Sequence, residues 1–221
     1  MNWYLKIISS SHNLKFPEGM EEQINSFINQ CVEYFFSKQD KPIYGGTFNY
    51  INPYTNQQDS INSIIFPSSP SGFEKTIALF NPQKKSISVF PYNHNINDIN
   101  PSVLFNYLKP YIYHEISHAI DPKFLIKDWW KNRKNIDYLL REEEFDAYSK
   151  QIEYIIQNNI NKTNIDNLET WLKTNDIDTI PDYLQNHKNK IQYWQENKPI
   201  YIRKLKQRIY NSFIGGIEND I

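Results

Sequence analysis

The sequence predicts an α+β fold, with a mixed or antiparallel β-sheet and one helix in residues 1–99 and a helical part in residues 100–221. Between Lys41 and Asn95, short aromatic and β-branched runs alternate with Pro, Ser, Asn and Gly, which is the pattern of strands and turns. Beyond this stretch, apolar residues recur mainly at helical spacing. A chain of 221 residues can bury a substantial core, so both parts fit a single domain.

The N-terminal part contains the predicted strands and the first helix. Residues 3–8 have the composition of a strand, and residues 17–36 place apolar side chains at helical spacing after a proline and an acidic first turn. The clearest strand pair is 76–80 with 86–90. The sequence NPQKK joins the two runs and predicts a hairpin with a slightly long loop.

The C-terminal part is predicted to be a series of helices. Pro110 separates the segment 101–109 from YIYHEISHAI, and we expect it to begin a new helix, because proline suits the first helical position. A long helix is predicted over 136–157, and the Asn-rich residues 157–167 predict a loop before shorter helices. The helix at 201–210 is predicted to turn four basic side chains to solvent: Arg203, Lys204, Lys206 and Arg208.

Charge and cysteine content limit the classes of function. The chain has 24 basic and 25 acidic side chains and a net charge of −1, so general attraction to nucleic acid or to an anionic membrane is not expected. The single cysteine, Cys31, excludes an internal disulfide and a cysteine-ligated zinc cluster, so a bound metal must use His and carboxylate. We see no secretory leader and no run of about 18 apolar residues, and expect a cytoplasmic protein without a membrane segment.

One aromatic and basic stretch offers a competing function. Trp129 and Trp130 stand among four basic residues, Lys127, Lys131, Arg133 and Lys134. Aromatic rings interleaved with cations can stack on bases and contact phosphates. Since the net charge is close to zero, we favour a loop whose tryptophans fill a core and whose basic side chains are solvated. A nucleic-acid partner is therefore not expected.

The stretch YIYHEISHAIDP, residues 111–122, carries the strongest functional motif. On a helix, His114 and His118 lie on one face, so each can direct a ring nitrogen at a common point that Glu115 flanks. Zinc fits this pair, and an adjacent carboxylate can take the proton of a water that attacks a carbonyl. Asp121 is a rival ligand, and fits better as the carboxylate that holds the other nitrogen of a histidine. The alternative is two ordinary half-buried histidines, which the adjacent glutamate and the uncharged flanks disfavour.

A catalytic zinc site needs a third protein ligand. A metzincin site would use a histidine where this chain has Phe124, so we look for a carboxylate instead. The helix predicted over 136–157 carries three adjacent glutamates, and its apolar face includes Glu144, whereas Glu142 points away and Glu143 lies to one side. A carboxylate on an apolar face is costly without a compensating partner such as a metal. Glu144 is the predicted ligand; the alternatives are a neighbouring glutamate or an ion-paired role for Glu144.

HEISHAID, together with the downstream EFDAY, resembles the gluzincin-type zinc peptidases, especially the compact single-domain members. In that family HExxH, often followed by A-x-D, precedes a helix with E-x-x-A whose glutamate is the third ligand. Residues 144–147 match this second motif, and the resemblance covers mainly residues 110–155. It implies one zincin-like catalytic domain over residues 1–221 and a Zn²⁺ cofactor held by His114, His118 and Glu144.

The resemblance also implies residues that bind substrate. Family members usually dock a peptide along an edge strand beside the cleft. We assign this edge to SISVF, and so to Ser86, Ile87, Ser88 and Val89. A Tyr or His usually stabilises the oxyanion; Tyr138 is the candidate, with a packed aromatic as its alternative role and His187 as the other possible donor.

The predicted function is therefore a zinc metallopeptidase that cleaves a peptide or protein, with Glu115 as the general base. The alternative is a non-catalytic, zinc-containing peptide-binding or regulatory module on the same scaffold.

Overall fold

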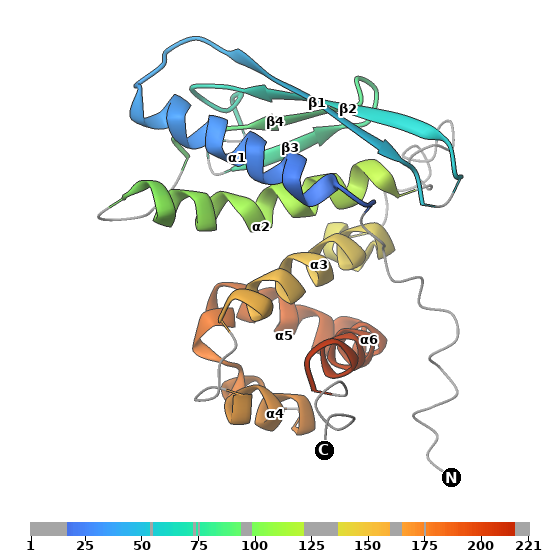
Figure 1. Cartoon of the computed structure of the whole chain (residues 1–221). Helices are drawn as coiled ribbons and strands as arrows, with labels where there is room; N and C mark the ends of the chain where they lie inside the picture. Colours follow the sequence, from blue (N-terminus) through green and yellow to red (C-terminus); the bar gives the residue numbers. More distant parts are fainter. Residues whose placement is uncertain are drawn as a thin grey trace. The chain divides into compact units, whose positions relative to one another are not determined.

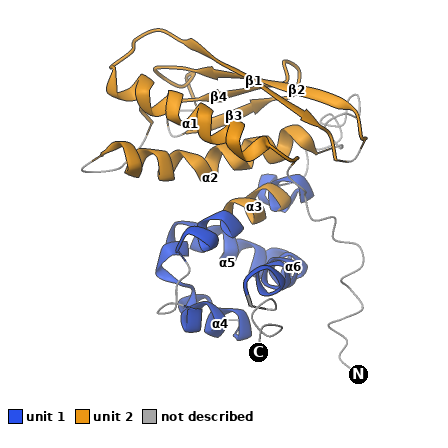
Figure 2. Cartoon of the chain, in the orientation of Figure 1, with its two compact units in different colours: residues 1–14, 137–145, 152–221 blue, residues 15–136, 146–151 orange. Residues whose placement is uncertain are grey.

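The computed structural model of the chain divides into two units, which we describe one at a time (Figure 2). The sheet unit comprises Lys15–Ile136 and Asp146–Gln151, and the helical unit comprises Met1–Leu14, Asp137–Phe145 and Ile152–Ile221. Strands and helices are both present, which confirms the predicted α+β class. One catalytic domain over the whole chain stays a prediction.

The structure describes residues 17–53, 55–72, 74, 76–93, 99–121, 137–159, 165–174 and 176–214. The strand predicted at 3–8 and the aromatic and basic stretch at 127–134 lie outside these residues. Within them, no helix is long and apolar enough to cross a membrane.

In the described part of the chain the sheet has four strands in the order β1-β2-β4-β3 (Figure 1): β1 (Ile43–Ile51), β2 (Gln58–Ile65), β3 (Ala78–Asn81) and β4 (Ser86–Val89). The pairs β1/β2 and β3/β4 are antiparallel, whereas β2 and β4 are parallel, so the sheet is mixed. The predicted hairpin is confirmed, because β3 and β4 pair with Phe80 opposite Ile87.

The place of SISVF in this sheet corrects one prediction. β4 pairs with β2 on one side and with β3 on the other, so Ser86, Ile87, Ser88 and Val89 belong to an interior strand. The prediction that they form the edge that docks substrate is wrong, because an interior strand uses its backbone groups toward both neighbours. Among the described strands, the one at this end of the sheet is β3.

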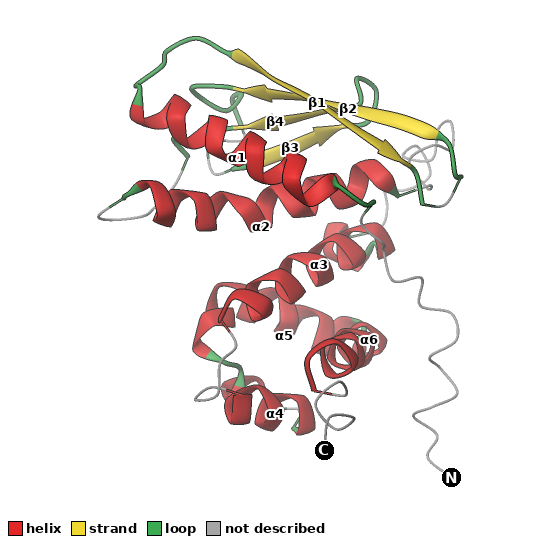
Figure 3. Cartoon of the chain, in the orientation of Figure 1, coloured by secondary structure: helices red, strands yellow, loops and turns green. Residues whose placement is uncertain are grey.

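Two helices, α1 (Met20–Phe36) and α2 (Pro101–Ile120), cover one face of the sheet (Figure 3). α1 packs against β1, α2 packs against β3 and β4, and the two helices pack against each other. The alternating pattern of the strands buries every second side chain against these helices. The core includes Ile24, Phe27, Ile28, Phe48, Ile61, Ile65, Ile87, Val89, Leu108, Ile112 and Ile116. The HEISH segment therefore lies on a helix that is seated on the sheet.

Pro110 lies inside α2, so the prediction that it begins a new helix is wrong. The helix begins after Asn100, whose side chain accepts a hydrogen bond of 3.0 Å from the N–H of Val103. A proline inside a helix removes one hydrogen bond to the preceding turn. Pro110 is buried together with Leu108 and Ile112, and this burial offsets the lost bond. One continuous helix thus carries the histidines.

The helical unit is built from short elements. It contains η5 (Tyr138–Leu140), both ends of α3 (Glu142–Asn159), α4 (Ile165–Lys173), η6 (Ile177–Thr179), η7 (Asp182–His187), α5 (Lys188–Asn197), α6 (Pro199–Ile209) and η8 (Tyr210–Ile214). The helix predicted over 136–157 begins only at Glu142, because Arg141 has an extended backbone after η5. The loop predicted over 157–167 is shorter, since α3 continues to Asn159 and α4 begins at Ile165.

Aromatic packing fixes the start of α3 within the helical unit. The ring of Phe145 stacks on Tyr201 with centroids 4.1 Å apart, and its edge meets Trp194 at 5.3 Å. The indole N–H of Trp194 donates to the carbonyl of Leu139 at 2.7 Å. The hydroxyl of Tyr201 donates to the carbonyl of Leu140 at 3.1 Å. The residue beside Glu144 is thus anchored in a core.

The basic face predicted for 201–210 is only partly present on α6. Arg203 is exposed, but Arg208 is buried and its guanidinium lies 5.4 Å from the centre of the Phe145 ring. The ammonium of Lys206 donates to the carbonyls of Trp171, at 2.7 Å, and Thr174. Cations suit the carbonyl-rich end of a helix, so Lys206 serves the end of α4 rather than solvent.

Candidate metal centre

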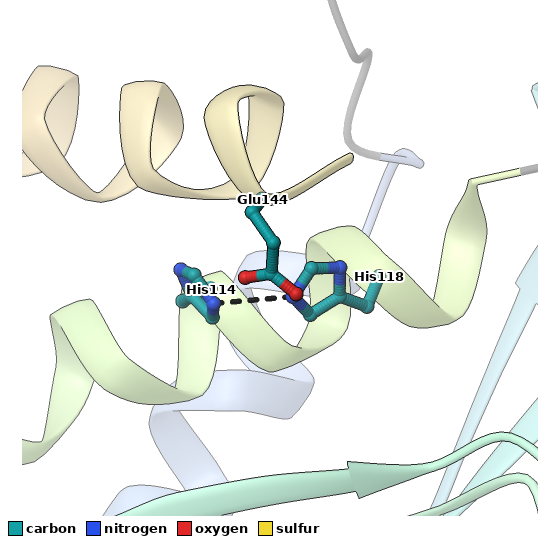
Figure 4. A group of neighbouring side chains, drawn as sticks. All are labelled: His114, His118 and Glu144. Atoms are coloured by element: carbon teal, nitrogen blue, oxygen red, sulfur yellow. Dashed lines mark hydrogen bonds between the residues drawn. The ribbon is translucent and has the colours of Figure 1, made fainter. Parts of the chain in front are cut away.

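α2 brings the two predicted histidine ligands together. The Nε2 atoms of His114 and His118 lie 3.1 Å apart, and both side chains are buried (Figure 4). Two neutral imidazoles at this distance must place a proton of one against the lone pair of the other, whereas a shared cation accepts both lone pairs. Zinc bonds of about 2.0–2.1 Å in a tetrahedron put two ligand nitrogens about 3.3 Å apart. The pair therefore fits zinc with little change.

Glu144 joins this pair from the first turn of α3. One carboxylate oxygen of Glu144 and one nitrogen of each histidine all lie within 4.8 Å of one another, and Figure 4 shows the carboxylate directed toward the two imidazoles. Glu144 is buried and Glu142 is exposed, as the helical phase predicted. Glu143 is buried as well, so proximity to the histidines distinguishes Glu144 where burial does not.

Tyr148 lies beside His114 within the sheet unit. Its ring lies against that of His114, with centroids 4.3 Å apart and planes inclined at 56°. Tyr148 follows Glu144 by four residues, so the two side chains share a face of α3. That spacing is the signal in the sequence that could have identified Tyr148 as a neighbour of the candidate metal ligands.

The donor set fits a zinc ion. Two imidazole nitrogens and one carboxylate oxygen are ligands that zinc accepts, and three protein ligands leave one position for water or substrate.

Cys31 is buried on α1 among the core residues of that helix, and desolvation raises the pKa of its thiol. It is therefore a core side chain.

Glu115 faces β3. Its Oε2 accepts a hydrogen bond of 2.7 Å from the main-chain N–H of Phe80, which lies in β3. The side chain is half-buried, one residue after His114. A carboxylate held here stands beside the candidate metal ligands without belonging to that group. No residue type signals this contact in advance, because the donor is a backbone group.

Three other predicted site residues lie outside the group of candidate metal ligands. Asp121 is buried at the end of α2, and its backbone N–H donates to the carbonyl of His118 at 3.3 Å. Tyr138 is 47% exposed on η5 and lies 5.7 Å from the Arg141 guanidinium. His187 is buried in the helical unit. The roles of Asp121 with a histidine and of Tyr138 or His187 at an oxyanion stay predictions.

Comparison of the sequence with protein-family models and with curated proteins, and of the structure with solved structures, finds no match. The geometry of the site is therefore the basis on which a function is proposed.

Proposed function

We propose that the protein is a zinc-dependent metallopeptidase in which His114, His118 and Glu144 hold the metal. The observation that supports this is the meeting of the three buried side chains within 4.8 Å, with Glu115 next along α2. Bound zinc would polarise the scissile carbonyl and make a water molecule more acidic. A zincin-like catalytic domain is part of the same proposal, and the HExxH and E-x-x-A motifs support it.

In this proposal Glu115 moves the protons. One carboxylate oxygen accepts the proton of the attacking water, and the carboxyl group then delivers it to the nitrogen of the departing amine. A hydrogen bond from the main-chain N–H of Phe80 holds Oε2 of this carboxylate in place. Both histidines are buried, which limits the access of water to the rings and favours a fixed site.

The substrate is a peptide or protein segment, and we assign its docking strand to β3 instead of β4. β3 lies at the end of the sheet and packs against α2, the helix with the histidines. An extended peptide can add to such an end strand through main-chain hydrogen bonds.

We expect the protein to act in a reducing compartment such as the cytoplasm, which suits its single buried cysteine.

Metal content of single variants tests the ligand set. The wild-type protein should bind one zinc per chain, Glu144→Ala should lose it, and the exposed neighbour change Glu142→Ala should keep it. Glu143→Ala is the stricter control, because Glu143 is buried like Glu144. Loss of zinc in Glu143→Ala with retention in Glu144→Ala would show that Glu144 is not the third ligand.

Cleavage of a mixed peptide library tests the activity. We expect cleavage by the zinc-loaded protein and none by Glu115→Gln, which should keep its zinc because Glu115 is not in the ligand group. Bound zinc and bound peptide without cleavage in the wild type would favour the alternative, a non-catalytic peptide-binding or regulatory module.

A further inference from the structure

The outward backbone groups of β3 are the starting point. In an antiparallel pair, residues alternate between those bonded to the partner strand and those whose N–H and C=O point away. The N–H of Phe90 donates to the carbonyl of Ile77 at 2.8 Å, so Ile77 faces β4. By alternation Leu79 also faces β4, whereas the backbone groups of Phe80 point away from the sheet.

Glu115 meets one of these outward groups. The distance of 2.7 Å between the Phe80 nitrogen and Oε2 is at the short end for an N–H donor, as expected when the acceptor is a carboxylate. Glu115 is held in this way although α2 and β3 are separated by 35 positions in the sequence. The packing of α2 on β3 therefore brings a specific donor to the residue beside His114.

We propose that the main-chain N–H of Phe80 is a positioning group for Glu115. The inference rests on the proposed function, since it assigns a partner to the proposed general base. A free glutamate side chain samples many rotamers, and fixing one carboxylate oxygen removes that freedom before substrate binds. The second oxygen is then presented in a constant direction. Misplacement of a catalytic group by about 1 Å can cost about a hundredfold in rate, so the bond should matter for turnover.

The hydrogen bond between Phe80 and Glu115 gives β3 a role other than the docking of substrate. The N–H of Phe80 is used by the protein itself, so a peptide lying along β3 cannot take this donor while Glu115 holds it. The proposal thus predicts that loss of the donor changes the chemical step more than the binding of substrate.

Hydrogen exchange of the metal-free, full-length protein tests the contact without any activity. The Phe80 amide should be protected in the wild type, and Glu115→Ala should speed its exchange by about tenfold or more, because local opening is no longer needed. The Leu79 amide faces β4 and serves as the control that should not change. Equal Phe80 exchange rates in the two proteins would overturn the proposal.

A pair of substitutions at Phe80 tests the role. Phe80→Pro removes the donor, and since this N–H points away from β4, it removes no bond of the sheet. Phe80→Ala removes the same ring but keeps the donor, and is therefore the reference. Relative to Phe80→Ala, we expect Phe80→Pro to lower kcat by about 10- to 100-fold, with KM and zinc content unchanged.

The outcomes separate this inference from the proposed function. Equal kcat values for Phe80→Pro and Phe80→Ala in a protein whose wild type cleaves peptides would reject the positioning role alone. A loss of zinc content comparable to the loss of kcat in Phe80→Pro would also reject the positioning role, and so would a rise of KM as the main effect. Either result points to a structural effect. A wild type that binds no zinc or cleaves nothing would reject the proposed function, and with it the task assigned to the bond. If Phe80→Pro does not fold, the exchange experiment alone decides.

Discussion

The ring of Tyr148 packs on the imidazole of His114 at a centroid distance of 4.3 Å. A metal-binding imidazole is held in its working orientation by its neighbours, and loss of such neighbours typically weakens metal binding about 10- to 100-fold. Here the neighbour is an aromatic face, whose contribution depends on the ring and not on the hydroxyl. Tyr148 is therefore expected to support zinc binding through packing.

We predict that Tyr148→Ala weakens zinc binding about tenfold or more, whereas Tyr148→Phe stays within about twofold of the wild type. Competition with a chelator of known affinity measures both values. Equal weakening in the two variants would show that the hydroxyl, and not the packing of the ring, supports the site.

Zinc should stabilise the folded protein through the two histidines. A ligand that binds only the native state raises the free energy of unfolding, by about 2.7 kcal/mol at a concentration of 100 times its Kd. We predict that zinc raises the Tm of the wild type and leaves that of His118→Ala unchanged. His187→Ala is the matched control, because His187 is a histidine of similar burial in the helical unit, and it should keep the zinc-dependent rise. Thermal unfolding with zinc and with chelator measures the difference.

The sequence predicted much of the candidate metal centre, because the proposed ligands obey local rules. His114 and His118 are one helical turn apart, so any helix through them brings them together. Glu144 needed a second argument from helical phase, which sets it apart from Glu142 and places Glu143 to one side of the apolar face. In the structure Glu143 is nevertheless buried like Glu144. Phase gives a direction around one helix. It does not say which partners surround that helix.

The remaining differences arise where tertiary contacts overrule local preferences. The sequence around Pro110 favours a break, yet burial of the proline with its neighbours keeps α2 continuous. The prediction of an edge at SISVF is wrong because a hairpin shows only one neighbour of a strand, and the parallel pairing with β2 comes from a distant segment. Backbone donors such as the N–H of Phe80 carry no residue-type signal at all.

Close packing of α1 on β1 gives a prediction about stability. A Cβ added at Gly45 would lie 2.3 Å from Cε2 of Phe27, whose side chain is buried. Overpacking of a filled core costs about 1–3 kcal/mol, so we predict that Gly45→Ala destabilises the protein by about this amount. Urea denaturation measures the loss.

A second substitution identifies the cause of that loss. Phe27→Leu removes the ring that the new methyl group would meet, so the double variant Gly45→Ala with Phe27→Leu should be more stable than the sum of the two single effects. Strict additivity would mean that contact with Phe27 is not the reason for the destabilisation.

An ion pair joins the β3–β4 turn to β2. The ammonium of Lys85 donates to Oδ1 of Asp59 at 2.7 Å, and the hydroxyl of Tyr50 donates to Oδ2 at 3.3 Å. Burial raises the pKa of Asp59, but the hydrogen bonds from Lys85, from the N–H of Ser60 and from Tyr50 outweigh it, so the pKa lies below its usual value. The same Tyr50 hydroxyl is 3.5 Å from the carbonyl of Ala119, the residue after His118.

This depressed pKa fixes the direction of a pH dependence. The unfolded state binds a proton at Asp59 more readily than the folded state does, so the stabilisation is complete above the unfolded pKa of about 3.9 and is lost as the pH falls through the lower folded pKa. We predict that Lys85→Met lowers the free energy of unfolding by about 0.5–1 kcal/mol at pH 7, a modest amount because the lysine is half exposed. Urea denaturation should show this difference shrinking as the pH is lowered below 4 and absent once Asp59 is protonated in both states. Lys84→Met, at the exposed neighbouring lysine, should have no such pH-dependent effect. A deficit in Lys85→Met that is the same at pH 7 and at pH 2 would mean that the aliphatic stem of Lys85, and not its charge, stabilises the turn.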